Sequence, residues 1–121
     1  MRGRSKITHV LDLTCLKQRL RRPGNISDCA ILWKSRNIFS IVELKGGFSH
    51  VGASLVAKQI QAGVDLIAEL IWDQHVIDFF PILLYRGRDP TTSLRRELIV
   101  FRGQRQRIII RACGTVLGSV V

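Results

Sequence analysis

The period at which apolar residues recur changes once along this chain, and that change limits the fold most strongly. Residues 28–34 and 38–45 are rich in β-branched and aromatic side chains and flank a short polar turn, which predicts a β-hairpin. Over residues 51–71 the apolar residues recur every three or four positions, which is the period of a helix. The members of this apolar stripe are Val56, Ile60, Val64, Ile67 and Ile71. A hairpin followed by a helix predicts a small α/β domain.

The remaining segments predict further strands around this unit. Residues 7–20 agree with either a strand or a helix. Residues 76–85 predict another strand, and Pro81 disfavours an undisturbed central position for it because proline lacks a ladder donor. Residues 98–101 and 108–110 predict a second hairpin around Gly103.

Length and composition predict one folded domain over residues 1–121. Apolar residues make up 46% of the chain and charged residues 23%, which excludes a disordered tail. No apolar run approaches the roughly 18 residues that a membrane span needs, and no apolar segment follows the basic first residues. We therefore expect a cytoplasmic protein with no membrane partner.

The charge is unevenly distributed and indicates a polyanionic partner. Nineteen Lys and Arg against nine Asp and Glu give a net charge of +10. Residues 1–22 and residues 86–121 each have a net charge of +6, whereas residues 23–85 have −2. Two basic flanks around a mildly acidic centre suit a nucleic acid that is held while acidic groups act on it. The alternative is that the basic flanks only increase solubility or bind phosphate without specificity.

The cysteines and histidines indicate no metal or disulfide framework. Cys15, Cys29 and Cys113 are odd in number and widely spaced. The three histidines are equally scattered, and no metal-site pattern continues around His75 and Asp78. We expect reduced thiols and ordinary surface histidines.

The two acids of the predicted hairpin can meet. Fourteen residues separate Asp28 from Glu43, and Lys45 points to the same face of its strand as Glu43. A two-residue turn at residues 36–37 would place Asp28 opposite Lys45, and a four-residue turn at residues 34–37 would place it opposite Glu43. A three-residue turn would separate the three side chains unless a bulge intervened.

Two carboxylates and one ammonium suit phosphodiester hydrolysis. Carboxylates and water can hold Mg²⁺, which polarises the phosphate and helps to generate a nucleophile. A neighbouring lysine can stabilise the developing negative charge. The alternative is a surface ion pair of Glu43 and Lys45, with Asp28 closing a turn. Carboxylates within apolar strands are costly without a partner or a metal, which favours a functional site.

An Asp, fourteen residues, then Glu-Leu-Lys, with a glutamine on the following helix, resembles the core of the PD-(D/E)XK nuclease superfamily. The resemblance covers about residues 27–71. It implies a restriction-endonuclease-like mixed β-sheet flanked by helices. It also implies that Asp28 and Glu43 bind Mg²⁺ or Mn²⁺, that the Leu44 carbonyl is a further ligand, and that Lys45 assists the chemistry.

Many members of this family place a glutamine from the next helix near the site. Gln59 and Gln61 lie on opposite edges of the apolar stripe. Gln59 has the better enclosed edge and is the expected site residue, with Gln61 as the alternative. Many relatives also have a Glu on the first helix, whereas here Asp12 is the only acid upstream of Asp28. Either Asp12 replaces that Glu, or the site has fewer ligands.

The sequence therefore predicts a metal-dependent nuclease that hydrolyses DNA through the catalytic residues Asp28, Glu43, Lys45 and Gln59. The alternative is a noncatalytic nucleic-acid-binding or assembly domain on the same fold. RNA as a substrate and a homodimer both stay open. The basic residues expected to contact nucleic acid around the site are Lys17, Arg19, Arg21, Arg22, Arg95, Arg96, Arg102, Arg105 and Arg107.

Overall fold

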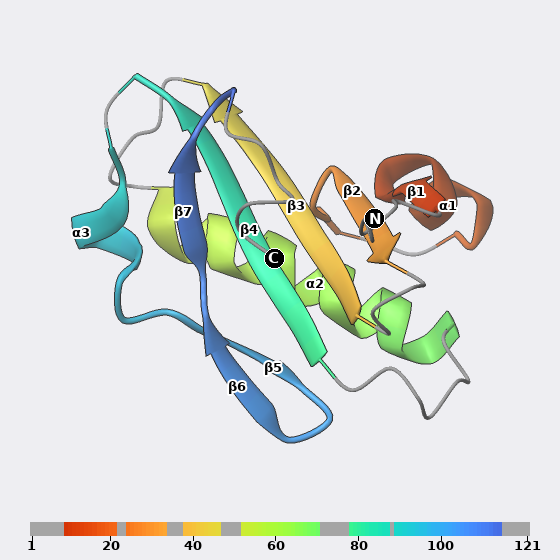
Figure 1. Ribbon diagram of the computed structural model, residues 1–121. Coiled ribbons are helices and arrows are strands. Elements are labelled where there is room, and N and C mark those ends of the chain that lie inside the picture. Colours follow the sequence, from red (N-terminus) through yellow and green to blue (C-terminus); the bar gives the residue numbers. More distant parts are fainter. Residues whose placement is uncertain are drawn as a thin grey trace, which may run out of the picture.

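A mixed five-stranded sheet with helices packed against it forms the centre of the protein (Figure 1). The computed structural model describes residues 9–21, 24–33, 38–46, 52–70, 78–87 and 89–114. The sheet has the order β1-β2-β3-β4-β7, and β5 and β6 form a separate two-stranded sheet. The elements are β1 (His9–Asp12), α1 (Leu13–Arg19), β2 (Cys29–Trp33), β3 (Ile38–Gly46), α2 (Ala53–Leu70), β4 (Asp78–Arg86), α3 (Thr91–Leu94), β5 (Leu98–Phe101), β6 (Gln104–Arg107) and β7 (Ile109–Ala112). The predicted α/β class and mixed sheet are confirmed.

The predicted hairpin is present as β2 and β3. The two strands are antiparallel, with Trp33 opposite Ile38, so four residues connect them. This connection, residues 34–37, lies outside the described residues. Of the turn lengths considered from the sequence, the register selects the four-residue one.

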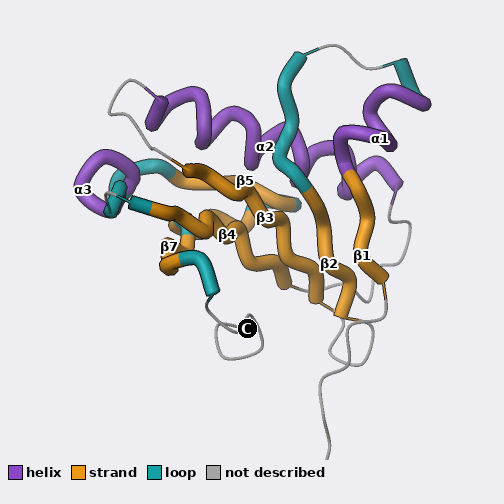
Figure 2. Tube along the Cα trace, turned by 90° about the horizontal axis from the view of Figure 1, so that it is seen from above, coloured by secondary structure: helices purple, strands orange, loops and turns teal. Residues whose placement is uncertain are grey.

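The predicted helix is α2, which connects β3 to the parallel strand β4. Figure 2 shows α1 and α2 on the same side of the five-stranded sheet. The stripe residues Val56, Ile60, Val64 and Ile67 are at most 1% exposed and pack against the sheet. The last predicted stripe residue, Ile71, lies outside the described part of the chain.

The ambiguous segment 7–20 contains both elements that its sequence allowed, first β1 and then α1. Asp12 makes the change of structure, because its carboxylate accepts a hydrogen bond from the Cys15 backbone N–H at 2.9 Å and caps the helix.

Pro81 lies in a central strand but is paired on one side only, which agrees with the expectation against an undisturbed central position. It belongs to β4, which lies between β3 and β7, and it is opposite Ile41 of β3. The pairing of β4 with β7 begins one residue later, at Ile82. On that side of β4 there is no ladder hydrogen bond at Pro81 to lose.

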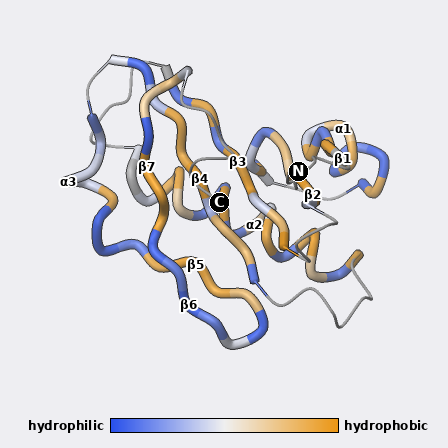
Figure 3. Tube along the Cα trace, in the orientation of Figure 1, coloured by the Kyte–Doolittle hydropathy of each residue, from blue (hydrophilic) through white to orange (hydrophobic). Residues whose placement is uncertain are grey.

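The predicted pairing of residues 98–101 with residues 108–110 is wrong. β5 pairs with the polar strand β6 instead, and β7 joins the main sheet parallel to β4. Arg102 and Gly103 have φ of 50° and 84°, which fits a tight two-residue turn and fixes Phe101 opposite Gln104. Figure 3 shows β6 as hydrophilic, in contrast to β3 and β4.

The core has one cluster on each face of the sheet. The cluster on the α2 face includes Phe39, Phe79 and Phe101, whose ring centroids lie 4.9–5.9 Å apart. The cluster on the opposite face includes Trp33 and Val42. Within the described residues, no helix is long and apolar enough to cross a membrane.

Candidate active site

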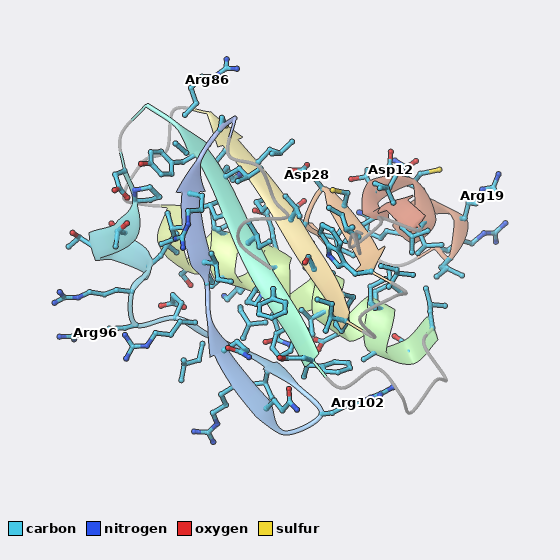
Figure 4. The ribbon with its side chains drawn as sticks, viewed as in Figure 1. Asp12, Arg19, Asp28, Arg86, Arg96 and Arg102 are labelled. Carbon is cyan, nitrogen blue, oxygen red and sulfur yellow. The ribbon has the colours of Figure 1, made fainter. Side chains whose placement is uncertain are left out.

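Asp28 and Glu43 lie opposite each other where β2 begins. Cys29 pairs with Val42 in the antiparallel ladder, so the next pair outward is Asp28 with Glu43. β3 continues beyond this point to Gly46 and remains paired with β4. Figure 4 shows Asp28 at this end of β2, beside β3. Glu43 shares a strand face with Phe39 and Ile41, so its side chain points to the α2 side of the sheet.

The two carboxylates replace the backbone ladder at this position. The backbone N–H of Asp28 donates to Glu43 Oε1 at 3.1 Å. The backbone N–H of Leu44 donates to Asp28 Oδ2 at 2.7 Å. Each acid therefore accepts a hydrogen bond from the opposite strand, and this exchange fixes both carboxylates at the point where β2 and β3 part.

Glu43 is an acid in an unfavourable environment. Its side chain is buried, with a relative exposure of only 3% for the residue. Burial, and then the negative charge of Asp28, raise the pKa of Glu43 from 4.5 to about 7. Lys45 opposes this shift, because its Nζ lies 3.6 Å from Glu43 Oε2. The ammonium does not offset the cost of burial fully, so the site favours additional positive charge.

The structure distinguishes the two candidate glutamines. The side-chain amide of Gln61 donates to the Val100 carbonyl and accepts from the Val100 N–H, both at 2.9 Å. Gln61 thus extends the edge of β5 as a further strand would, and its amide is occupied. Gln59 Oε1 is buried without a hydrogen-bond partner. The Gln59 carbonyl accepts from the Ser27 N–H at 3.1 Å, which places Gln59 next to the residue that precedes Asp28.

Asp12 lies near the pair but is used elsewhere. It pairs with Cys29, and its carboxylate caps α1. Burial raises the pKa of the Cys29 thiol, and the charges of Asp28, Asp12 and Glu43 raise it further, so all three acids lie around Cys29. In the described part of the chain, no three His, Cys, Asp or Glu residues form a group that could hold a metal ion.

A metal ion at this site would have oxygen ligands from Asp28 and Glu43 and, as the resemblance implies, from the Leu44 carbonyl. Carboxylate and carbonyl oxygens suit hard cations such as Mg²⁺, which usually keeps several waters and needs only one or two protein carboxylates. A divalent cation would also stabilise the ionised form of the buried Glu43. The residues present therefore fit Mg²⁺ or Mn²⁺.

Several of the basic residues predicted to contact nucleic acid lie away from the two carboxylates in the described part of the chain. Lys17 Nζ donates to the Gly24 carbonyl at 2.5 Å, and Arg22 lies outside the described residues. Gln106 of β6 hydrogen-bonds to Asp78 at the first position of β4, whereas Glu43 is opposite Leu83, toward the other end of that strand. Figure 4 shows Arg96 and Arg102 away from Asp28, and Arg19 on the far side beyond β1.

Two residues near the site were missed at the sequence level. Tyr85 is opposite Lys45, and Arg86 is opposite Gly46, at the carboxyl end of β4. Both line an open hollow of about 640 Å³, together with Gly87 and residues 112–114. The signal was available, because ligands commonly bind at the carboxyl ends of parallel strands and residues 76–85 were predicted as a strand.

Comparisons with known proteins found no relative of this chain. The chain matches no protein-family model, no curated protein and no solved structure.

Proposed function

We propose that this protein is a metal-dependent nuclease that hydrolyses DNA phosphodiester bonds, on a restriction-endonuclease-like fold. The order of strands, helix and acids along the chain agrees with the resemblance described above. Asp28 and Glu43 converge at one end of the β2–β3 hairpin, and Lys45 lies against Glu43.

The burial of Glu43 is the observation that supports this proposal best. A carboxylate that is 3% exposed beside a second carboxylate is destabilised unless a cation compensates it. A pair that served only as a surface ion pair would need neither the burial nor the second acid. The arrangement is therefore better explained by a site that accepts a divalent cation.

The chemistry divides among the residues as follows. When bound, Mg²⁺ or Mn²⁺ would polarise a phosphate oxygen and lower the pKa of a bound water. Asp28 and Glu43 would hold the cation, each fixed by a backbone N–H from the opposite strand. Lys45 is half-buried and would stabilise the negative charge that develops on the phosphate. In hydrolysis a water oxygen bonds to phosphorus, the bond to one ester oxygen breaks, and that oxygen takes up a proton.

Cleavage assays on conservative variants test the proposal. Linear, nicked, branched and single-stranded DNA would be incubated with Mg²⁺, Mn²⁺ or a chelator. We expect Asp28→Asn, Glu43→Gln and Lys45→Ala to reduce metal-dependent cleavage by at least 100-fold, on the order of 3 kcal/mol of lost transition-state stabilisation. Asp65→Asn and Lys58→Ala are matched controls on the exposed face of α2 and should cleave as wild type does. Equal cleavage by all five variants would refute the assignment of the site.

A noncatalytic nucleic-acid-binding domain is the second candidate. The two hydrogen bonds between Asp28 and the Glu43–Leu44 segment would stabilise the end of the hairpin without any metal. In that case wild type would bind DNA but cleave none of the four substrates with either metal. Glu43→Gln, which keeps an acceptor for the Asp28 N–H, would then fold and bind as wild type does.

A further inference from the structure

An open hollow of about 330 Å³ lies at β7, the edge strand farthest from β1. Three arginines from three different segments line it: Arg95 follows α3, Arg107 ends β6 and Arg111 lies within β7. The other lining residues are Thr91 and residues 108–110, the segment between Arg107 and Arg111. Neither Asp28 nor Glu43 lines this hollow, and it shares no lining residue with the hollow beside Tyr85 and Arg86.

The charge in this hollow is not compensated by the protein. No acidic side chain lines it. Within the residues that the structure describes, none of the three arginines forms an ion pair, and Arg111 only donates to the Ile110 carbonyl at 2.9 Å. The positive charges of three arginines around one hollow repel one another, and a bound anion offsets this repulsion. Guanidinium groups bind phosphate oxygens in a bidentate geometry, so a phosphate group suits the hollow best.

The hollow lies two strands away from the candidate active site, at the β7 edge of the sheet. Glu43 is opposite Leu83 of β4, and Leu83 is opposite Ile110 of β7. Neighbouring strands are about 4.8 Å apart, so the backbones at Glu43 and Ile110 are separated by roughly 10 Å. Phosphates follow one another at about 3.4 Å per nucleotide along the axis of a duplex strand. Arg111 is opposite Leu84 and therefore points to the sheet face away from α2, so a strand bound at both places would pass around the β7 edge and would span several nucleotides.

We propose that Arg95, Arg107 and Arg111 form a phosphate-binding site for a nucleic-acid strand that extends from the two carboxylates. The proposal rests on the proposed function for the place where that strand is cut. Binding at the hollow itself needs no cleavage and no metal, so the two can be tested separately.

The test uses the full chain with Glu43→Gln and a chelator, so that the DNA stays intact. An eight-nucleotide single strand is titrated while the side-chain Nε–Hε signals of the arginines are followed by NMR. We expect saturable shifts at Arg95, Arg107 and Arg111, which millimolar inorganic phosphate reverses in part. Arg19 and Arg21, at the opposite edge of the sheet, should shift less. Equal shifts at Arg19 and Arg21, or none at the three arginines, would overturn the proposal.

Matched double variants distinguish binding at these specific arginines from attraction by the net positive charge of the protein. Arg95→Gln/Arg107→Gln and Arg19→Gln/Arg21→Gln lower the net charge equally. We expect the first pair to weaken binding of the strand at least tenfold more than the second pair does. Equal weakening would mean that only overall charge matters, and the proposal would fall even if wild type cleaves DNA. Unequal weakening in a protein that cleaves nothing would support the phosphate site and refute the nuclease activity.

Discussion

At the scale of single residues, the main feature is an acid buried next to another acid. Glu43 is protonated more easily in the folded protein than in the unfolded chain, since burial and Asp28 raise its pKa to about 7. Asp28 and Glu43 could be predicted from the sequence as a pair because period-two alternation and an even turn bring them together. Their exchange of backbone hydrogen bonds could not, because it depends on where β2 ends.

This pKa gives the metal-free protein a defined dependence of stability on pH. Between pH 4.5 and 7 the folded state binds more protons at Glu43 than the unfolded state, so stability falls as pH rises. The full shift corresponds to roughly 3 kcal/mol. Glu43→Gln should remove this part of the pH dependence and be more stable than wild type at pH 8. Urea unfolding of both proteins at pH 5 and pH 8 measures it, and parallel pH profiles would contradict the burial argument.

The two glutamines of α2 should respond in opposite ways to substitution by leucine. Gln61→Leu removes two hydrogen bonds to Val100 and should destabilise the fold by about 1–2 kcal/mol. Gln59→Leu removes a buried amide oxygen that has no partner, so the fold should be unchanged or slightly more stable. If Gln59 positions substrate or water, cleavage by this variant falls while its stability does not. Thermal unfolding and cleavage rates of both variants decide between these roles.

At the scale of the elements, local sequence patterns predict the helices and hairpins that form between residues close together in the chain. The hairpin of β2 and β3 and the helix α2 follow from their periods and are present. β6 is a run of Gln and Arg with no apolar alternation, so its pairing with β5 depends on the turn at Arg102 and Gly103 rather than on burial. The parallel addition of β7 to β4 is a long-range contact and has no local signal.

The contact between α2 and the start of β2 has no space for an added methyl group. A Cβ on Gly63 would overlap Ser27 Oγ and lie 3.0 Å from Ile41 Cγ2. Gly63→Ala should therefore destabilise the protein by about 1–3 kcal/mol, although alanine favours a helix. Ser27→Ala removes a buried hydroxyl without a hydrogen-bond partner and should restore part of the loss in the double variant. Additive losses in urea unfolding would show that the two residues do not meet.

At the scale of the whole molecule, the main feature is the excess of positive charge and where the fold places it. The net charge of +10 predicted a polyanionic partner, but the sequence could not predict where the arginines lie. Among the described arginines, Arg19 and Arg21 lie beside β1, whereas Arg95, Arg105 and Arg107 lie around α3 and β6, on the side away from α1 (Figure 1). If the protein binds DNA as we propose, its contacts would be spread across the sheet rather than concentrated at the carboxylates.

Binding to DNA should depend strongly on salt and should increase when the acids of the site are neutralised. Each phosphate contact contributes about −0.9 to the slope of log K against log salt for duplex DNA. Asp28→Asn/Glu43→Gln removes negative charge near the bound phosphate and should tighten metal-free binding at low salt. Asp65→Asn removes a distant carboxylate and should change binding less. Fluorescence anisotropy over a salt series measures both effects, and a slope near zero would contradict an electrostatic footprint.

The most direct test of the central claim is the titration of the Glu43 carboxyl carbon by NMR, with and without Mg²⁺. Without the metal we expect a pKa near 7, as burial and Asp28 dictate. Saturating Mg²⁺ should lower this pKa by more than one unit, because a bound cation stabilises the carboxylate, and Asp28→Asn should weaken the effect. A Glu43 pKa that Mg²⁺ leaves unchanged would show that the two acids do not hold a metal, and the proposed nuclease site would be wrong.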